Sequence, residues 1–209
     1  MKKRIPLIIA LICIFGLGIT FTVNSKITDE IRLLLGSTID NNTVKIGHVV
    51  MDSDIGKPTE EQWYDGGWNL LLRPKNPALA ENSAKAFEEG IANDNIGKKF
   101  GDRNSAYESF KKTMKITKIE PSNTDDSAFI TLCAIAGGCD KLNYSGNAPT
   151  NKTIRKAFAA TGEYEVLKQN EYLTSDQYLR RGDILVNERG QTVMVLSNGK
   201  KYNHDPSRK

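Results

Sequence analysis

The chain has 209 residues with 29 basic and 25 acidic side chains, a formal net charge of +4. Without the three basic residues near its start, 26 basic residues face 25 acidic ones, so the remainder is almost neutral. Nucleic-acid binding calls for a basic face, and this balance argues against that class of partner. No Cys/His spacing is typical of a metal site, and we expect neither a metal nor a cofactor.

The first two dozen residues predict a membrane anchor. Residues 5–23 contain no charged side chain, follow the basic cluster Lys2-Lys3-Arg4, and reach the roughly 20 residues that span a bilayer. Because basic residues stay in the cytoplasm, everything after residue 24 is expected outside. A cleaved signal peptide is the alternative, and it also leads to export. We therefore expect a single-pass cell-membrane protein with an extracellular C-terminal domain.

Four segments follow from this pattern. Residues 1–24 form the basic cluster and anchor (or signal peptide), and residues 25–42 form a polar stalk with a short helical stretch. Residues 43–203 form one domain, and residues 204–209 form a polar tail. The exported part is long enough for one domain with a sizeable core.

The first half of the domain contains a strand and two helices. Residues 43–51 are rich in β-branched side chains and are bounded by turn residues, which predicts a strand. Residues 76–91 place apolar side chains at helical spacing, with Pro77 near the start, where a helix tolerates it. A second amphipathic run over residues 105–114 predicts another helix.

A buried helix is predicted over residues 123–138. Thr124 or Asp125 would cap its start, and two glycines would stop it. Asp126 would lie in the first turn, where the helix dipole and the free amides stabilise an acid by roughly 0.3–1 kcal/mol.

The helix carries Cys133, which lies two turns after Asp126 on the same face and should point into the core as an inert thiol. Cys139 lies six residues later, and the two cysteines can form a small disulfide loop if the helix ends between them. Two free thiols are the alternative.

The last third predicts a helix over residues 151–161 and a hairpin. Two apolar strands, within residues 181–186 and 191–196, are joined by a glycine-containing turn. Asp183, in the turn before the first strand, is expected to be structural. Helices first and strands last, with one capped central helix, indicate an α+β domain.

Several short motifs occur in an order and spacing that chance explains poorly. In chain order they are Lys45-Ile46-Gly47-His48, Trp63-Tyr64 with Trp68, Leu72-Arg73-Pro74-Lys75, Ala92-Asn93-Asp94-Asn95-Ile96-Gly97, Arg103-Asn104, Thr124-Asp125-Asp126-Ser127, Arg181-Gly182-Asp183-Ile184-Leu185, Gly190-Gln191-Thr192-Val193 and Ser197-Asn198-Gly199. Over about residues 44–200 the chain resembles papain-like cysteine hydrolases of the NlpC and CHAP types, which cut peptidoglycan, and more narrowly a phage-endolysin-like branch of Gram-positive bacteria. The resemblance implies helices packed on an antiparallel sheet.

The resemblance fails at the two catalytic positions. In such enzymes a cysteine opens the buried helix, and a histidine on the facing strand takes its proton. This chain has Asp126 at the first position and Gln191 at the second. Glutamine cannot act as a base, and losing either partner costs roughly 10⁴–10⁶ in kcat. The resemblance therefore implies a catalytically inactive domain in which both positions are degenerate.

Binding is the function that remains, either to peptidoglycan or to a cell-wall-associated protein such as a hydrolase or toxin that the domain restrains. Aromatic side chains and arginines are enriched in binding surfaces. The expected contact residues are His48, Trp63, Tyr64, Trp68, Arg73, Arg103 and Asp125. Core packing is the alternative for both tryptophans, and a structural role is the alternative for His48. An exposed Asp126 would favour a cationic group, such as the amine of a diamino acid.

Two further functions stay open. One is an active cell-wall peptidase or amidase with a non-standard site. The other is a structural component of an envelope secretion or conjugation machine. A permanent anchor fits binding or assembly better than it fits a lysin, which must diffuse to its substrate.

Overall fold

The computed structural model describes residues 43–50, 56–99 and 101–204, which belong to the compact unit Asn42–Lys209. The expected anchor, the stalk and the last five residues lie outside the described residues. Within the described part of the chain, no helix is both long enough and apolar enough to cross a membrane.

A six-stranded sheet forms the centre of the domain, with every neighbouring pair antiparallel. In spatial order its strands are β2 (Lys57–Gln62), β1 (Lys45–Val50), β8 (Thr192–Val195), β7 (Ile184–Val186), β3 (Leu70–Pro74) and β6 (Tyr164–Leu167). A separate parallel pair joins β4 (Ile96–Gly97) to β5 (Ser122–Asn123). Helices beside an antiparallel sheet confirm the predicted α+β class.

The four predicted helices are confirmed, together with shorter turns that were not predicted. They are α3 (Pro77–Ile91), α4 (Ser105–Thr113), α5 (Asp126–Ala136) and α6 (Ile154–Ala160), and the short elements are α7 (Asn170–Leu173), η1 (Ile116–Lys118) and η2 (Asp140–Leu142). The Asn76 side chain caps α3 by accepting the N–H of Ala78 at 2.9 Å.

The expected order of helices first and strands last is wrong, because three strands precede α3. β2 reads Lys-Pro-Thr-Glu-Glu-Gln, a polar sequence at the edge of the sheet that lacks an apolar alternation. β3 is a short run buried along its whole length, which periodicity alone cannot assign to a strand.

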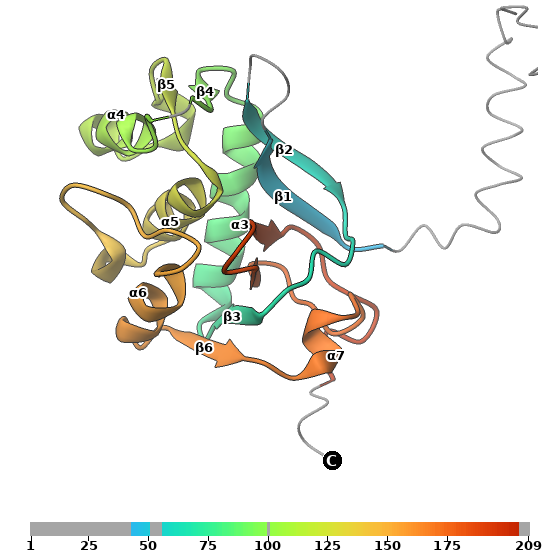
Figure 1. Ribbon diagram of the computed structural model, residues 1–209. Coiled ribbons are helices and arrows are strands. Elements are labelled where there is room, and N and C mark those ends of the chain that lie inside the picture. Colours follow the sequence, from blue (N-terminus) through green and yellow to red (C-terminus); the bar gives the residue numbers. More distant parts are fainter. Residues whose placement is uncertain (1–42, 51–55, 100, 205–209) are drawn as a thin grey trace, which may run out of the picture. The chain divides into compact units, whose positions relative to one another are not determined.

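The sheet buries both of its faces. Along β3, Leu70 and Leu72 belong to one hydrophobic cluster, and Leu71 between them belongs to another. Successive side chains of a strand point to opposite faces, so the two clusters lie on opposite sides of the sheet. Helices α3 and α5 pack together on the first side (Figure 1). The aromatic segment 63–68 and the segment around α7 contribute to the second cluster.

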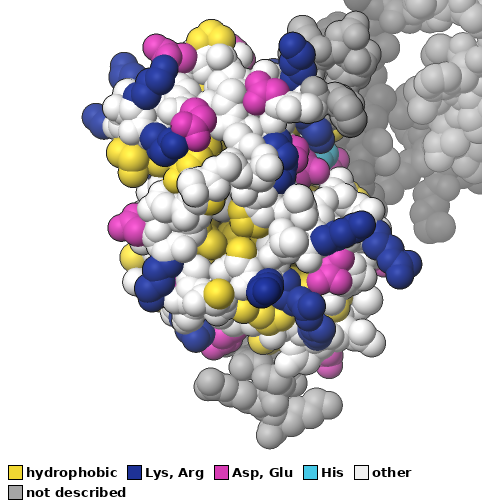
Figure 2. Space-filling view, turned by 60° about the vertical axis from the view of Figure 1, so that its left-hand side comes forward, with side chains coloured by type: hydrophobic (Ala, Val, Ile, Leu, Met, Phe, Trp, Pro, Cys, Tyr) yellow, Lys and Arg dark blue, Asp and Glu magenta, His cyan; other side chains and the backbone are white. Residues whose placement is uncertain are grey.

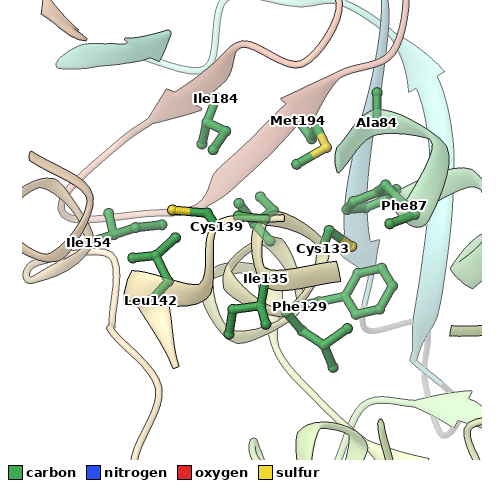
Figure 3. Close-up of a cluster of buried hydrophobic side chains, with 14 of the residues drawn as sticks. Ala84, Phe87, Phe129, Cys133, Ile135, Cys139, Leu142, Ile154, Ile184 and Met194 are labelled. Atoms are coloured by element: carbon green, nitrogen blue, oxygen red, sulfur yellow. The ribbon is translucent and has the colours of Figure 1, made fainter. Parts of the chain in front are cut away.

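Close packing of α3 against α5 depends on a glycine. A Cβ atom at Gly90 of α3 would lie 2.2 Å from the ring of Phe129 on α5, so only glycine fits at this contact. The Phe129 ring meets Phe87 edge-on, with the ring centroids 4.9 Å apart. Figure 3 shows this part of the cluster, with Met194 of β8 facing the helices.

Both cysteines of the domain are free and buried, so the disulfide loop does not form. Cys133 is fully buried, as predicted, and Cys139 is 2 % exposed. In Figure 3 Cys133 lies near Phe87, and Cys139 points towards Ile154. Burial raises the pKa of the Cys133 thiol well above its ordinary value, which makes it a poor nucleophile.

The visible surface carries both signs of charge. Figure 2 shows basic and acidic side chains scattered over one face, with apolar side chains near its centre. A mixed surface of this kind agrees with the near-neutral balance of the sequence.

Candidate functional site

The N-terminus of α5 is held by an aspartate cap and an arginine. Asp125 accepts the N–H of Ala128 at 2.8 Å, which identifies it as the cap. Arg103 binds both oxygens of the same carboxylate, through Nε at 2.6 Å and Nη2 at 3.0 Å. Burial opposes ionisation of Asp125, but the hydrogen bonds from Arg103 and Ala128 outweigh it and lower the pKa.

Arg103 also ties the loop before α6 to this helix. Its Nη1 donates to the carbonyl of Ala148 at 2.5 Å, and its Nη2 donates to the carbonyl of Pro149 and to Ser127 Oγ, both at 3.0 Å. The guanidinium therefore directs its hydrogen bonds inward. The structure assigns Arg103 a positioning role at the edge of the site.

Asp126, the first residue of α5, connects this helix to the end of β1. Its Oδ1 accepts the N–H of Val49 at 3.0 Å. Lys98 Nζ lies 3.8 Å from the same oxygen and donates to the carbonyl of Val49 at 2.8 Å. Burial raises the pKa of Asp126, against the opposing effects of Lys98 and the Val49 N–H. The side chain is only 15 % exposed, so this carboxylate mainly serves an internal contact.

Asp126 lies where β1 and β8 separate. The two strands pair at Ile46 with Val195 and at Gly47 with Met194. Continued by two residues, this register would bring Val49 opposite Thr192. The Val49 N–H instead points to Asp126. The sheet thus opens at the start of β8, next to Gln191.

Gln191 is held on the other side of this opening. Its Nε2 donates a short hydrogen bond to the hydroxyl of Tyr64. Burial raises the pKa of Tyr64, and the negative charges of Glu61 and Asp126 add to the effect. Tyr64 therefore interacts electrostatically with Asp126 and is hydrogen-bonded to Gln191. Asp126 and Gln191 thus both lie near Tyr64.

Asn151 links the two sides and was not singled out from the sequence. Its Oδ1 accepts the hydroxyl of Thr192 at 2.7 Å, and its Nδ2 donates to the carbonyl of Gly190 at 2.6 Å. These are the two neighbours of Gln191. No local sequence signal marks Asn151, because its partners lie about 40 positions away.

A small cavity lies between these groups. It measures about 160 Å³ and is lined by Arg103, Asp125, Asp126, Ser127, Thr150 and Asn151. A water molecule takes about 30 Å³ of liquid volume, so the cavity holds a few waters or one small polar group. Two carboxylates are balanced by Arg103 and Lys98, which leaves the lining polar and close to neutral.

The predicted aromatic contact residues are packed into the second cluster. Trp68 is 5 % exposed, and its Nε1 donates to the carbonyl of Tyr64 at 3.1 Å. The Tyr64 and Trp68 rings lie 5.8 Å apart, and Trp63 packs half-buried against the same cluster. A contact role for Trp68 is wrong, because its ring is core. Tyr64 is the aromatic residue that borders the cavity region, through Gln191.

His48 is also largely enclosed. It is 9 % exposed, and its Nε2 lies 3.0 Å from Glu61 Oε1 across the β1–β2 pair. Its charge, when present, lowers the pKa of Asp126, so it lies near the site without lining the cavity.

Arg73 lies away from the site at Asp126, and its guanidinium is engaged in an internal ion pair instead of the expected contact. It is 6 % exposed and binds Asp183 through Nε at 2.8 Å and Nη2 at 2.6 Å. The β7–β8 register pairs Val186 with Thr192, near Gln191, whereas Asp183 precedes the other end of β7. The Arg73–Asp183 pair therefore lies at the opposite end of the sheet. Its structural role confirms what was expected of Asp183.

Within residues 43–50, 56–99 and 101–204, no cluster of three histidine, cysteine, aspartate or glutamate side chains could hold a metal ion. The arrangement offers hydrogen-bond donors and acceptors around a small cavity.

Comparison with known proteins gives one match. A family model described as an endolysin-like domain matches residues 36–202, which include the whole site. No curated protein and no solved structure matches the chain.

Proposed function

The chain belongs to the endolysin-like domain family, and from this premise we propose that it is a wall-facing domain that binds peptidoglycan without cleaving it through a cysteine–histidine pair. We assign it to the papain-like NlpC/CHAP type. The order of its motifs supports this assignment, as does the capped helix α5, which opens beside the start of β8.

The main support for the proposed loss of cysteine hydrolysis is that Asp126 and Gln191 make internal hydrogen bonds. The Asp126 carboxylate holds the Val49 N–H and lies beside Lys98, and the Gln191 amide is bonded to Tyr64. Each replacement side chain has its own internal partner. These contacts stabilise the opening between β1 and β8, and neither group can generate a thiolate or accept its proton.

The cavity chemistry favours a neutral polar ligand group. Asp126 is neutralised by Lys98, and Asp125 is neutralised by Arg103, so a cationic amine gains less here than an exposed Asp126 would give. Thr150 and Asn151 contribute polar lining. We expect a peptide amide of the wall to enter, with Tyr64 and Asn151 at the border of the contact.

Cosedimentation with purified Gram-positive cell walls tests this binding. The full-length chain should pellet with the walls and release no dye from labelled walls. Thr150→Trp places a large ring at the exposed rim of the cavity and should abolish pelleting. Thr113→Trp makes the same change at an exposed position on α4 and serves as the matched control. Equal behaviour of the two variants would contradict binding at this cavity.

A gain-of-function variant tests the origin of the site. Asp126→Cys with Gln191→His restores both groups at the start of α5 and beside β8. Lys98 and the helix N-terminus would stabilise the thiolate. The double variant should release dye from labelled walls, and each single variant should remain silent.

A working hydrolase with a non-standard site is the second candidate, because Asp126 lines the cavity and a carboxyl group can act as a general acid or base. Dye release by the unmodified chain, abolished by Asp126→Asn, would establish this candidate and overturn the first. If the unmodified chain neither pellets nor releases dye, a protein partner in the envelope replaces the wall as the ligand.

We also propose that residues 1–24 anchor the chain and place the domain outside the cell. The uncharged segment 5–23 and the basic cluster before it support this topology. Protease treatment of intact cells should remove the domain and leave a short membrane-bound fragment. Protection of the domain until the cells are lysed would contradict the topology.

A further inference from the structure

A larger polar cavity lies at the end of the sheet opposite Asp126 and Gln191. It measures about 430 Å³ and lies between the end of β3, the start of α3 and the segments 180–183 and 198–203. An adjoining cavity of about 420 Å³ shares Arg73, Arg180 and Asn203 with it. Cavities of 300–1,000 Å³ are typical of small-molecule sites.

Most charged groups around the larger cavity are already paired. Arg73 binds Asp183 through two hydrogen bonds. Arg181 binds Glu81 at 2.8 Å and Glu88 at 2.6 and 2.8 Å, and it also donates to a backbone carbonyl. These side chains stabilise the walls of the cavity and have little capacity left for a ligand.

Arg180 is different. It lines both cavities and is half-buried, and its Nε donates to the carbonyl of Tyr202 at 2.8 Å. Among the described residues, no hydrogen bond reaches its two terminal nitrogens and no carboxylate lies within ion-pair distance of its side chain, although its charge opposes the rise in the pKa of Asp183 and Glu165 lines the adjoining cavity. Lys75 lines the same cavity, and its Nζ donates to the carbonyl of Gly162 at 2.8 Å; its charge also contributes to lowering the pKa of Glu163. The lining thus has two cations whose charge is not matched by an ion pair within the described residues.

We infer that this cavity binds an oxyanion with two neighbouring oxygens, a carboxylate or a phosphate, on the fork of Arg180. A guanidinium group presents parallel N–H donors that match two such oxygens, and its attachment to Tyr202 orients it. Lys75 adds a second positive charge. The site is distinct from the cavity at Asp126, so this inference does not depend on wall binding there.

The two sources of such an anion are separated by three probes. Acetyl-dialanine carries a free C-terminal carboxylate, its C-terminal amide is the neutral control, and inorganic phosphate is the alternative anion. The Nε–H signal of Arg180 in ¹⁵N-labelled full-length chain should shift saturably with one of the two anions, and it should not shift with the amide. The anion that binds more tightly identifies the source.

Three variants locate the site. Arg180→Gln removes the charge and should weaken binding at least tenfold, and Arg180→Lys keeps the charge without the fork and should give an intermediate affinity. Arg189→Gln removes a comparably charged, exposed side chain in the turn between β7 and β8 and should bind normally. Thermal melting of each variant verifies that it is folded.

A chain without residues 205–209 should bind the probes at least as well as the full chain, since the inference assigns binding to residues up to 204. Loss of binding in that variant would overturn the inference. The inference would also be overturned if neither anion gave a saturable shift at low salt. It would equally be overturned if Arg180→Gln bound the anion as tightly as the unmodified chain.

Discussion

Replacing Arg73 with methionine should strongly destabilise the domain, because it leaves Asp183 buried without its counter-charge. The Asp183 side chain is 1 % exposed and accepts two hydrogen bonds from Arg73 and one, at 2.8 Å, from the N–H of Arg180. The Arg73 guanidinium also lies 4.8 Å from the centre of the Tyr172 ring. After the substitution the Arg180 N–H and the more distant charge of the Arg180 side chain remain to stabilise the carboxylate.

The expected loss is about 3–5 kcal/mol, the usual cost of removing one member of a buried ion pair. Domains typically unfold with about 5–15 kcal/mol, so the variant keeps a reduced margin. With an m value of about 2 kcal/mol/M, the midpoint of urea unfolding should fall by roughly 2 M.

The decisive comparison adds Asp183→Asn to Arg73→Met. Asparagine has the same shape and still accepts the Arg180 N–H, but it carries no charge to bury. The double variant should therefore be more stable than Arg73→Met alone by at least about 1 kcal/mol, because the unpaired charge accounts for much of the loss.

Measuring the stability of Arg73→Met as a function of pH provides a second test of the cost of burying the Asp183 charge. Burial already raises the pKa of Asp183 in the unmodified chain, and removal of Arg73 should raise it further. A carboxyl group with a raised folded-state pKa favours folding at low pH, and this stability is lost as the pH rises. The deficit of Arg73→Met should thus be smaller at pH 5 than at pH 7. A constant deficit, or a double variant no more stable than the single one, would refute the charge-burial argument.

Four other changes have expected outcomes, each measured by urea unfolding. Asp125→Ala should cost about 2–3 kcal/mol at pH 7, a value that combines the lost cap with the Arg103 hydrogen bonds and allows for partial solvent screening. This deficit should shrink as the pH falls below the ordinary Asp value of 3.8, because the lowered pKa of Asp125 contributes stability only above it. Asp126→Asn should be at least as stable as the unmodified chain at pH 7 and equally stable at pH 3, because the pKa of Asp126 is raised in the folded chain. A clear loss of stability at pH 7 would show that the contact with Lys98 outweighs the cost of burying the charge. Gly90→Ala should cost about 1–3 kcal/mol by overpacking Phe129, and a stabilising effect would show that the helices can separate freely. Met114→Gly should stabilise by about 0.5–1 kcal/mol, because Met114 ends α4 with a φ of 56°; an unchanged midpoint would contradict strain at this residue.

The site combines two kinds of residue that serve the same opening. Asp125 and Arg103 hold the start of α5 against the loop before α6. Asp126 and Lys98 hold it against β1, and Asn151 holds the loop against the start of β8. Under the proposed binding role, these internal contacts would hold the walls of the cavity in place.

Local features of the chain were readable from the sequence. The helix over 76–91, the capped helix that begins at Asp126 and the hairpin of β7 and β8 follow from side-chain periodicity and from capping and turn residues. These signals act between residues a few positions apart. The positions of Asp126 and Gln191 near one opening followed from the motif resemblance, and not from periodicity.

Tertiary structure alone decided which side chains remain available for contact. Arginine and tryptophan are residue types that are common in binding surfaces. The sheet order, however, places Arg73 against Asp183, 110 positions away, and Trp68 in the hydrophobic cluster on the second face. The roles of Asn151 and Arg180 also depend on tertiary structure, because Asn151 bonds to the distant Gly190 and Arg180 lines a cavity between separate elements. Burial and pairing depend on which strands become neighbours. The order of strands in the sheet is determined by packing throughout the domain, so it cannot be predicted from a short window of sequence.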